Sequence, residues 1–390
     1  MRDEREPLPA GRRAFTEDPL KIESTGIIGT GLIGGSLALA MRKYGWPGEI
    51  AGFDEDTESL KEALRSKALD RTATSAAELA RQADLLVLAV PVRAIAPLLE
   101  YVAPFLREGA LVIDVGSTKS GIMRAAEKTM PPHATFVGGH PMAGSERRGF
   151  AHADPDLFRG AAFIFTPPRE CAPEVYSFLS QAFTGLGARV LFMDAETHDR
   201  AVAVVSHLPH VLAFALVNLV LEESGDAQAM TNIVSGGFRD MTRIAASDAS
   251  LWADILLENR TEVERALTCY LALLEEIRVL VRSEDAAALM DQMKRARSGR
   301  LGMVPALGES MEDLYAVIVP VENRPGMISS ITRALGELGV NLEDLEITHP
   351  LEGGSGLLRL YVRGEEIAAK SRRVLAERGY DAVAERVMAT

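Results

Sequence analysis

The chain has 390 residues, 47% apolar and 25% charged, which is typical of a soluble globular protein and predicts two or three domains. The net charge of −13 and the lack of a basic cluster argue against nucleic acid as a partner. Two cysteines, Cys171 and Cys269, make neither a disulfide framework nor a recognised metal spacing, so we expect a reducing cytoplasmic location. Residues 1–20 mix both charges with prolines and predict a disordered tail rather than a signal peptide.

A glycine-rich turn follows the first apolar run, Lys21–Ile28, and leads into a helical pattern that ends near Tyr44. Gly29, Gly31 and Gly34 have the G-x-G-x-x-G spacing that dinucleotide-binding turns need for a tight bend, a close approach to pyrophosphate and close helix packing. The amino end of the helix would then face the phosphates. Because glycine-rich turns are common, this spacing alone is a weak signal.

A second predicted strand, Glu49–Phe53, strengthens the dinucleotide hypothesis because it ends in Asp54. A carboxylate there accepts hydrogen bonds from ribose hydroxyls and repels a 2′-phosphate, so NAD is favoured over NADP. The alternative is an ordinary surface aspartate at a strand end. The residues expected to contact NAD are Gly29, Thr30, Gly31, Leu32, Ile33, Gly34, Asp54, Val90, Pro91 and Ser117.

Further apolar runs alternate with helical patterns up to about residue 194. The predicted strands are Ala83–Val90, Ala110–Val115 and Thr135–Val137, and the predicted helices are Ser75–Gln82, Ala94–Phe105 and Lys119–Thr129. This alternation predicts a parallel, doubly wound Rossmann-like sheet, which Ala161–Phe165 and Val190–Met193 extend. Ligands of such sheets bind outside the carboxyl ends of the strands.

The stretch Gly138–Glu146 follows one of these strands and is predicted to be a loop, because its glycines and proline suit neither strand nor helix. Its position places His140 where the nicotinamide end of a dinucleotide should lie.

From Thr197 onward the pattern becomes helical. Ala201–Leu221 is long enough to span a bilayer, but it contains two histidines and a proline and lacks basic or aromatic flanks. We therefore expect a buried helix near a site and no membrane association. His207 and His210 would share one face of that helix if Pro209 does not break it. No further ligand stands at zinc spacing, so no metal is expected.

The segment Val234–Arg243 has two glycines and two arginines, and we expect a loop in which an arginine holds a carboxylate. Composition alone does not choose between Arg239 and Arg243, and a surface salt bridge is the plainer alternative. In the helix that follows, apolar residues recur at alternating spacings of four and three. These residues, which predict either packing within the chain or a homodimer interface, are Val263, Leu267, Tyr270, Leu274, Ile277 and Val281.

A glycine-, serine- and proline-bearing stretch, Arg297–Asp313, predicts a linker to a last domain. The elements after it have the order βαββαβ, which predicts a small ferredoxin-like sandwich. They are Leu314–Val321, a helix from Pro325 to Leu338, Asn341–Thr348, Leu357–Val362 beyond a Gly353-Gly354 turn, Glu365–Arg378 and Asp381–Val387.

Several motifs together resemble the prephenate/arogenate dehydrogenases of tyrosine biosynthesis, from about Thr25 to Arg295. They are GxGLIGGS, DVGSTK, GGHPMAGSE, SHLPH and SGGFRDMTRIAASD, and ENRPGMISSIT resembles the strand-to-helix turn of an ACT domain. The resemblance implies a dinucleotide-binding domain at 21–194 and a helical substrate and dimerisation domain at 195–298. It further implies a linker at 299–312 and an ACT regulatory domain at 313–390.

The resemblance also implies a reaction, the NAD-dependent oxidative decarboxylation of prephenate to 4-hydroxyphenylpyruvate, and roles for single residues. His140 matches the catalytic histidine, and Ser117 matches a serine beside the substrate hydroxyl and nicotinamide. Arg243 matches the arginine that holds a substrate carboxylate, and by this analogy takes precedence over Arg239. The other positions implied to contact substrate are His210, Glu146, Ser145, Trp252 and Gly236. The ACT domain implies feedback control, with tyrosine as the expected ligand.

Three alternatives remain open from the sequence. An arogenate dehydrogenase differs only in an amino group on the substrate side chain. A β-hydroxyacid dehydrogenase would place a lysine in the helical domain, where this chain has His207 and His210. A regulatory dinucleotide sensor without turnover would need no proton acceptor such as His140.

Overall fold

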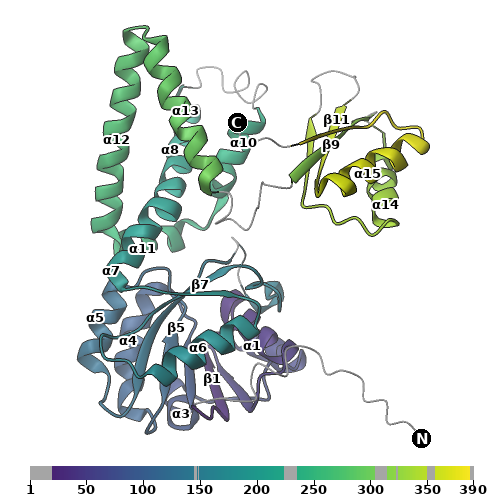
Figure 1. Cartoon of the computed structure of the whole chain (residues 1–390). Helices are drawn as coiled ribbons and strands as arrows, with labels where there is room; N and C mark the ends of the chain where they lie inside the picture. The colour runs from purple at the N-terminus through teal and green to yellow at the C-terminus, as the bar shows by residue number, and fades with distance from the viewer. Residues whose placement is uncertain are drawn as a thin grey trace, which may run out of the picture. The chain divides into compact units, whose positions relative to one another are not determined.

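The computed structural model describes residues 20–144, 147, 149–223, 235–303, 314–321, 324–348 and 356–386. The chain divides into two compact units, Met1–Leu273 and Leu274–Thr390. The first unit contains a large sheet covered by helices, followed by a helical segment, and the second contains a small sheet with two helices (Figure 1).

The described strands of the first unit form one eight-stranded sheet with the order β3-β2-β1-β4-β5-β6-β7-β8. The strands from β3 to β6 are all parallel to their neighbours, as predicted for a doubly wound sheet. The strand bounds are β1 Ser24–Ile28, β2 Glu49–Phe53, β3 Arg71–Thr72, β4 Leu85–Leu88, β5 Leu111–Asp114, β6 Thr135–Pro141, β7 Ala162–Thr166 and β8 Arg189–Phe192.

The parallel arrangement predicted for the sheet does not continue from β6 to β7, which pair antiparallel, with His140 opposite Ile164. A parallel pair needs a long crossover connection, usually a helix. The described part of the connection from β6 to β7 contains instead a short 3₁₀ helix, η3 (Phe150–His152). The strand β7 therefore returns alongside β6, and β8 extends the sheet in parallel with β7.

Helices cover both faces of this sheet, which explains why its central strands are apolar on both sides. In β4, Leu85 and Val87 belong to one apolar cluster while Leu86 and Leu88 belong to the other. The first cluster includes residues of α1, α2 and α6, and the second includes residues of α3, α4, α5 and α11. The helices are α1 Leu32–Lys43, α2 Thr57–Arg65, α3 Ala76–Gln82, α4 Val92–Val102 with η2 Ala103–Phe105, α5 Ser120–Thr129 and α6 Pro173–Gly185.

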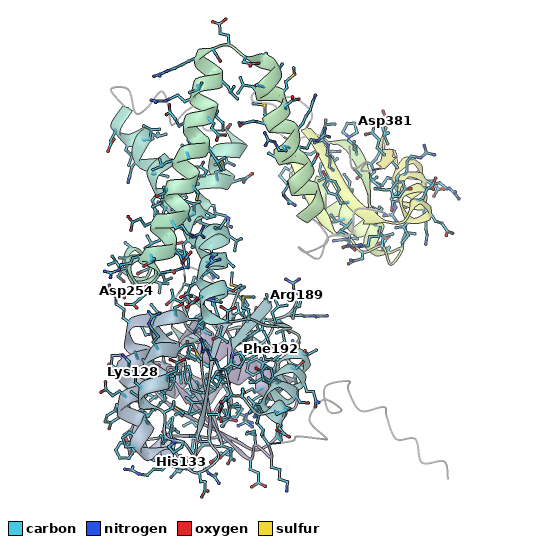
Figure 2. The ribbon with its side chains drawn as sticks, turned by 60° about the vertical axis from the view of Figure 1, so that its left-hand side comes forward. Lys128, His133, Arg189, Phe192, Asp254 and Asp381 are labelled. Carbon is cyan, nitrogen blue, oxygen red and sulfur yellow. The ribbon has the colours of Figure 1, made fainter. Side chains whose placement is uncertain are left out.

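The helical segment begins directly after β8 and packs on the sheet domain through α11. Arg93 of α4 makes ion pairs with Glu258 and with Asp254, which is labelled in Figure 2. Its Nη1 lies 3.1 Å from an oxygen of Asp254. Trp252 and Ile255 of α11 enter the same apolar cluster as α4 and α5. The elements are α7 Ala195–Val202, the π-helical turn η4 Ala203–His207, α8 Leu208–Glu223, α10 Gly236–Thr242, η5 Arg243–Ala246, α11 Ala249–Glu258 and α12 Arg260–Arg282.

In the described part of the chain, Ala195–Glu222 forms a helix that is long enough and apolar enough to cross a membrane. Core helices of soluble proteins also meet this criterion. The prediction that this helix is buried within its own chain is wrong, because only 17% of its apolar window is buried. Large side chains such as Val205, Leu219 and Leu221 are exposed. Its first half packs against α12 through a small cluster that includes Leu208 and Val263.

The apolar residues of the α12 seam are likewise buried in the first half of the helix and exposed in the second. Val263 is buried, and Leu267 and Tyr270 pack beside it. Leu274, Ile277 and Val281 are 43%, 40% and 59% exposed. Among the described residues, packing within the chain therefore buries only the first half of the seam.

The second unit begins within α12 and continues through α13 (Ala286–Met303). The helix α13 extends to Met303, so residues 299–303 of the predicted linker are helical; residues 304–313 lie outside the described residues. The predicted βαββαβ sandwich is confirmed, with an antiparallel sheet of order β10-β11-β9-β12. Its elements are β9 Leu314–Val321, α14 Met327–Gly336, β10 Asp344–Thr348, β11 Gly356–Arg363, α15 Glu365–Glu377 and β12 Val383–Arg386.

Candidate active site

The glycine turn between β1 and α1 has the geometry that a dinucleotide pyrophosphate requires. Gly29 has φ +94°, and a Cβ there would lie 2.2 Å from the carbonyl oxygen of Ala89. A Cβ on Gly34 would lie 1.9 Å from the carbonyl oxygen of Gly29, so helix and turn pack without a side chain. A Cβ on Gly31 would meet no described atom within 4 Å, which leaves the turn open to a ligand.

The amino end of α1 also suits an anion. Its N-cap, Gly31, provides no side-chain cap, and the first turn of the helix has no acidic residue. Free N–H groups and the helix dipole together favour a phosphate at such a position. Leu32 and Ile33 are half-buried in this first turn.

Asp54 stands at the carboxyl end of β2, beside the turn, as the sequence predicts. Its Oδ2 accepts hydrogen bonds from the backbone N (2.5 Å) and Oγ1 (3.1 Å) of Thr30, and its Oδ1 accepts one from Asp56 N. The carboxylate is thus fixed against the glycine turn, and its Oδ1 keeps a lone pair for a ribose hydroxyl. Val90 and Pro91 follow β4 at the same edge of the sheet.

Asp114 at the end of β5 connects two segments that carry predicted site residues. It is fully buried and accepts hydrogen bonds from Gly116 N (2.8 Å) and Gly139 N (3.0 Å). Its charge is paired with the equally buried ammonium of Lys119. One carboxylate therefore fixes the loop containing Ser117, which is half-buried, beside the strand containing His140.

His140 lies in strand β6, so the prediction of a loop is wrong for Gly138–Pro141. The two glycines serve close packing within the sheet. A Cβ on Gly138 would lie 2.1 Å from Thr166 Oγ1, and one on Gly139 would lie 2.3 Å from the carbonyl oxygen of Asp114. Ser145 and Glu146, the later members of the stretch, lie outside the described residues.

His140 is 8% exposed and contacts a second buried histidine. Its Nδ1 lies 2.8 Å from Nε2 of His198, which belongs to α7. Burial lowers the pKa of His140 well below its usual range, and the nearby His198, Lys119 and His207 lower it further. The imidazole is therefore neutral at physiological pH and able to accept a proton.

Hydrogen bonds continue from this pair into the helical segment. His198 Nδ1 lies 2.8 Å from Asp199 Oδ1, and the backbone carbonyl of Asp199 accepts a hydrogen bond from Asn259. Asn259 Nδ2 lies 3.2 Å from Nδ1 of His207, whose ring meets that of Trp252 edge to face. Burial lowers the pKa of His207 to about 4.

A second group of predicted residues gathers around Trp252. His210 stacks on its ring with centroids 3.4 Å apart, and Nδ1 of His210 lies 2.9 Å from the carbonyl oxygen of Ser206. Burial lowers the pKa of His210, and the charge of the nearby Arg243 lowers it too. The rings of His207, in the π-helical turn, and of His210, in α8, thus both contact the ring of Trp252.

The expected loop at Val234–Arg243 is wrong for the part that the structure describes. Gly236 begins α10, and Arg243 begins η5. Gly236, Arg239 and Arg243 are all exposed in this chain. Two glycines at the first helical positions have little effect on the helix, although they resemble a loop in the sequence.

Comparison with known proteins identifies the family. Residues 37–192 match the model for the prephenate dehydrogenase nucleotide-binding domain, 194–295 the model for its dimerization domain, and 315–379 the ACT domain. The chain is 32% identical to prephenate dehydrogenase of Bacillus subtilis over 90% of its own length and 95% of that protein. The chain belongs to the prephenate dehydrogenase family.

Solved structures of prephenate dehydrogenase relatives agree in fold. The Aquifex aeolicus prephenate dehydrogenase in complex with hydroxyphenyl propionate and NAD⁺ is 32% identical, with a TM-score of 0.67 over 72% of this chain and 98% of that one. The Synechocystis arogenate dehydrogenase is 28% identical, with a TM-score of 0.65 over 72% of this chain and all of that one. The predicted family, fold class and NAD-dependent dehydrogenase activity are confirmed.

Several residues of this prephenate dehydrogenase site escaped the sequence analysis. Asp114 and Lys119 lie in the DVGSTK motif, whose conspicuous feature was Ser117. His198 and Asp199 form a His-Asp pair at the start of the helical segment, which was the one available signal. In the described part of the chain, no three His, Cys, Asp or Glu side chains are arranged to hold a metal ion.

Proposed function

We propose that this protein oxidises and decarboxylates prephenate, using NAD⁺, to give 4-hydroxyphenylpyruvate, carbon dioxide and NADH. The observation that carries the proposal is His140, a buried and neutral imidazole at the carboxyl end of β6. A sensor protein has no use for such a proton acceptor. Its setting beside the Ser117 loop is the one that an alcohol oxidation requires.

The residues divide the chemical work between them. His140 accepts the proton of the substrate's C4 hydroxyl while the C4 hydride leaves, and Ser117 orients that hydroxyl. NAD⁺ supplies the hydride acceptor, and the glycine turn with Asp54 holds it. The bond from C1 to its carboxylate then breaks, and its electron pair enters the ring, which becomes aromatic. The C4 oxygen takes the proton back from His140, which gives the phenol of the product. The enzyme mainly positions the reactants and accepts one proton.

The substrate is a dianion and the protein has a net charge of −13, so a local cation must hold it. We assign this role to Arg243, because its charge acts on His210, which stacks on Trp252. These three residues, with Gly236, are proposed to line the substrate site. Ser145 and Glu146 are proposed to complete the lining.

Arg243→Gln should raise KM for prephenate by about 10- to 100-fold, as expected when a charge-assisted hydrogen bond is lost, and leave KM for NAD⁺ unchanged. Arg239→Gln is the matched control, since Arg239 is an exposed arginine one helical turn earlier. A larger effect of the Arg239 variant would contradict the assignment.

Membership of the family does not decide between prephenate and arogenate as the substrate, because the Synechocystis relative is an arogenate dehydrogenase. The test is the rate of NADH formation, measured by its absorbance, with prephenate and with arogenate in parallel. The proposal predicts a higher kcat/KM with prephenate. A higher value with arogenate would replace it with direct tyrosine formation, and no NADH with either substrate would overturn both.

We further propose a cytoplasmic homodimer formed by the helical domain, with boundaries at 195–298, and a regulatory ACT domain at 313–390 that binds tyrosine. The ACT match and the βαββαβ fold support an amino-acid sensor. Tyrosine should inhibit the full chain. A variant lacking the residues after Met303 should lose this inhibition, and equal inhibition of the two proteins would contradict the assignment.

A further inference from the structure

Three buried side chains form a continuous hydrogen-bonded chain behind the proposed proton acceptor. His140 Nδ1 lies 2.8 Å from His198 Nε2, and His198 Nδ1 lies 2.8 Å from Asp199 Oδ1. The three residues are 8%, 0% and 3% exposed. Among the described residues, Nε2 of His140 makes no hydrogen bond. The other two side chains of the hydrogen-bonded series therefore contact the imidazole at Nδ1, on the side opposite Nε2.

Asp199 determines the direction of every hydrogen bond in this chain. Its Oδ1 accepts from Lys119 N at 2.7 Å, and its Oδ2 accepts from Ser120 N at 2.8 Å. Burial raises the pKa of Asp199, but the hydrogen bonds from His198 and Ser120 outweigh it and lower the pKa overall. The carboxylate is therefore ionised and can only accept hydrogen bonds.

The protons of both histidines follow from this anchor. His198 must donate its Nδ1–H to Asp199, and an imidazole with its single proton on Nδ1 has Nε2 as an acceptor. His140 must then donate its own Nδ1–H to His198. The lone pair of His140 is consequently on Nε2, the nitrogen turned away from the chain.

We propose that His198 and Asp199 are positioning residues that hold His140 in the Nδ1–H tautomer and stabilise its charge when it is protonated. The inference rests on the proposed role of His140 as proton acceptor. In the step itself, the hydroxyl proton moves to Nε2 of His140, and both hydrogen bonds of the chain remain. The positive charge formed on His140 is attracted to the negative charge of the Asp199 carboxylate. Because the side chains between them are buried, the low dielectric strengthens this attraction.

The substitution Asp199→Asn tests the anchor. An amide has only one acceptor oxygen, so its NH₂ group must face either Ser120 N–H or both Lys119 N–H and His198. The second arrangement reverses the His198 tautomer and with it that of His140. Asp194→Asn is the matched control, because Asp194 is an exposed carboxylate that caps the same helix, and asparagine caps equally well.

The first measurement is ¹⁵N NMR of histidine-labelled protein, which distinguishes Nδ1–H from Nε2–H rings directly. The chain has 7 histidines, so the His140 signals can be assigned from a His140→Asn sample. We expect Nδ1–H for His140 in the wild type and the Asp194 control, and loss of part or all of that form in Asp199→Asn, according to the share of each amide arrangement. An Nε2–H ring in the wild type would overturn the proposal, whether or not the protein oxidises prephenate.

The second measurement compares His198→Gln with His198→Leu in NADH formation. A glutamine carbonyl can accept the Nδ1–H of His140, whereas leucine cannot. We expect kcat to fall about 10²-fold or more in His198→Leu and in Asp199→Asn, with KM for NAD⁺ unchanged, and His198→Gln to recover at least about 10-fold relative to His198→Leu. Equal kcat in the glutamine and leucine variants, or wild-type kcat in Asp199→Asn, would overturn the proposal. Circular dichroism of each variant separates these results from misfolding.

Discussion

The protonation state of His140 is set by its burial rather than by an opposite charge. Its ring contacts His198, and the charges near it, Lys119 and His207 among them, also disfavour a proton. The sequence could indicate His140 because the GGHPMAGSE motif contains it. It could not show that His198, 58 positions away in α7, contacts His140.

A pH prediction follows from this lowered pKa. A base works when unprotonated, so kcat/KM should be at its full value above the pKa of His140 and fall as the pH drops through it. Since that pKa lies below 6.5, the acid limb of the profile should lie below pH 6.5 as well. The profile of kcat/KM for prephenate measures it, and a limb centred above 6.5 would contradict the account.

At the scale of elements, the alternation of apolar runs and helices gave most of the sheet, because buried parallel strands are continuously apolar. The antiparallel return of β7 and the strand character of Gly138–Pro141 were missed. The return of β7 follows from its connection to β6, whose described part has no long crossover helix. The strand character of Gly138–Pro141 has another cause. The glycines of β6 are required by neighbours on each side, Thr166 and Asp114, which only the folded sheet brings close.

Gly139→Ala should therefore destabilise the protein, since its Cβ would lie 2.3 Å from the Asp114 carbonyl oxygen. Overpacking of this kind costs about 1–3 kcal/mol. Gly237→Ala is the control, because a Cβ there meets no described atom within 4 Å and alanine favours a helix. Denaturant midpoints measure both, and an unchanged midpoint in Gly139→Ala would show that the strand can move.

At the scale of the whole molecule, the apolar surface of α8 and α12 needs a covering partner. Leu219 of α8 and Leu271 and Leu273 of α12 are more than half exposed in the single chain. The sequence analysis could not choose between packing within the chain and packing between chains, because both require the same seam. In the described part of the chain, only the first half of the seam packs against other residues, and the family model that matches this region is a dimerization domain.

The double substitution Leu274→Glu with Ile277→Glu should convert the proposed dimer to a monomer, because two buried carboxylates per chain would have no partner. Glu276→Gln, an exposed change on the same helix, should leave the dimer intact. Sedimentation velocity at micromolar concentration measures the outcome. Wild-type protein that sediments as a monomer would contradict the interface.

The most direct test of the central claim is NADH formation from prephenate by the wild type and by His140→Asn. Asparagine preserves hydrogen bonding but cannot accept the proton, so kcat should fall by about 10²–10⁴-fold while NAD⁺ binding is unchanged. Near-normal turnover in His140→Asn would show that His140 is not the proton acceptor.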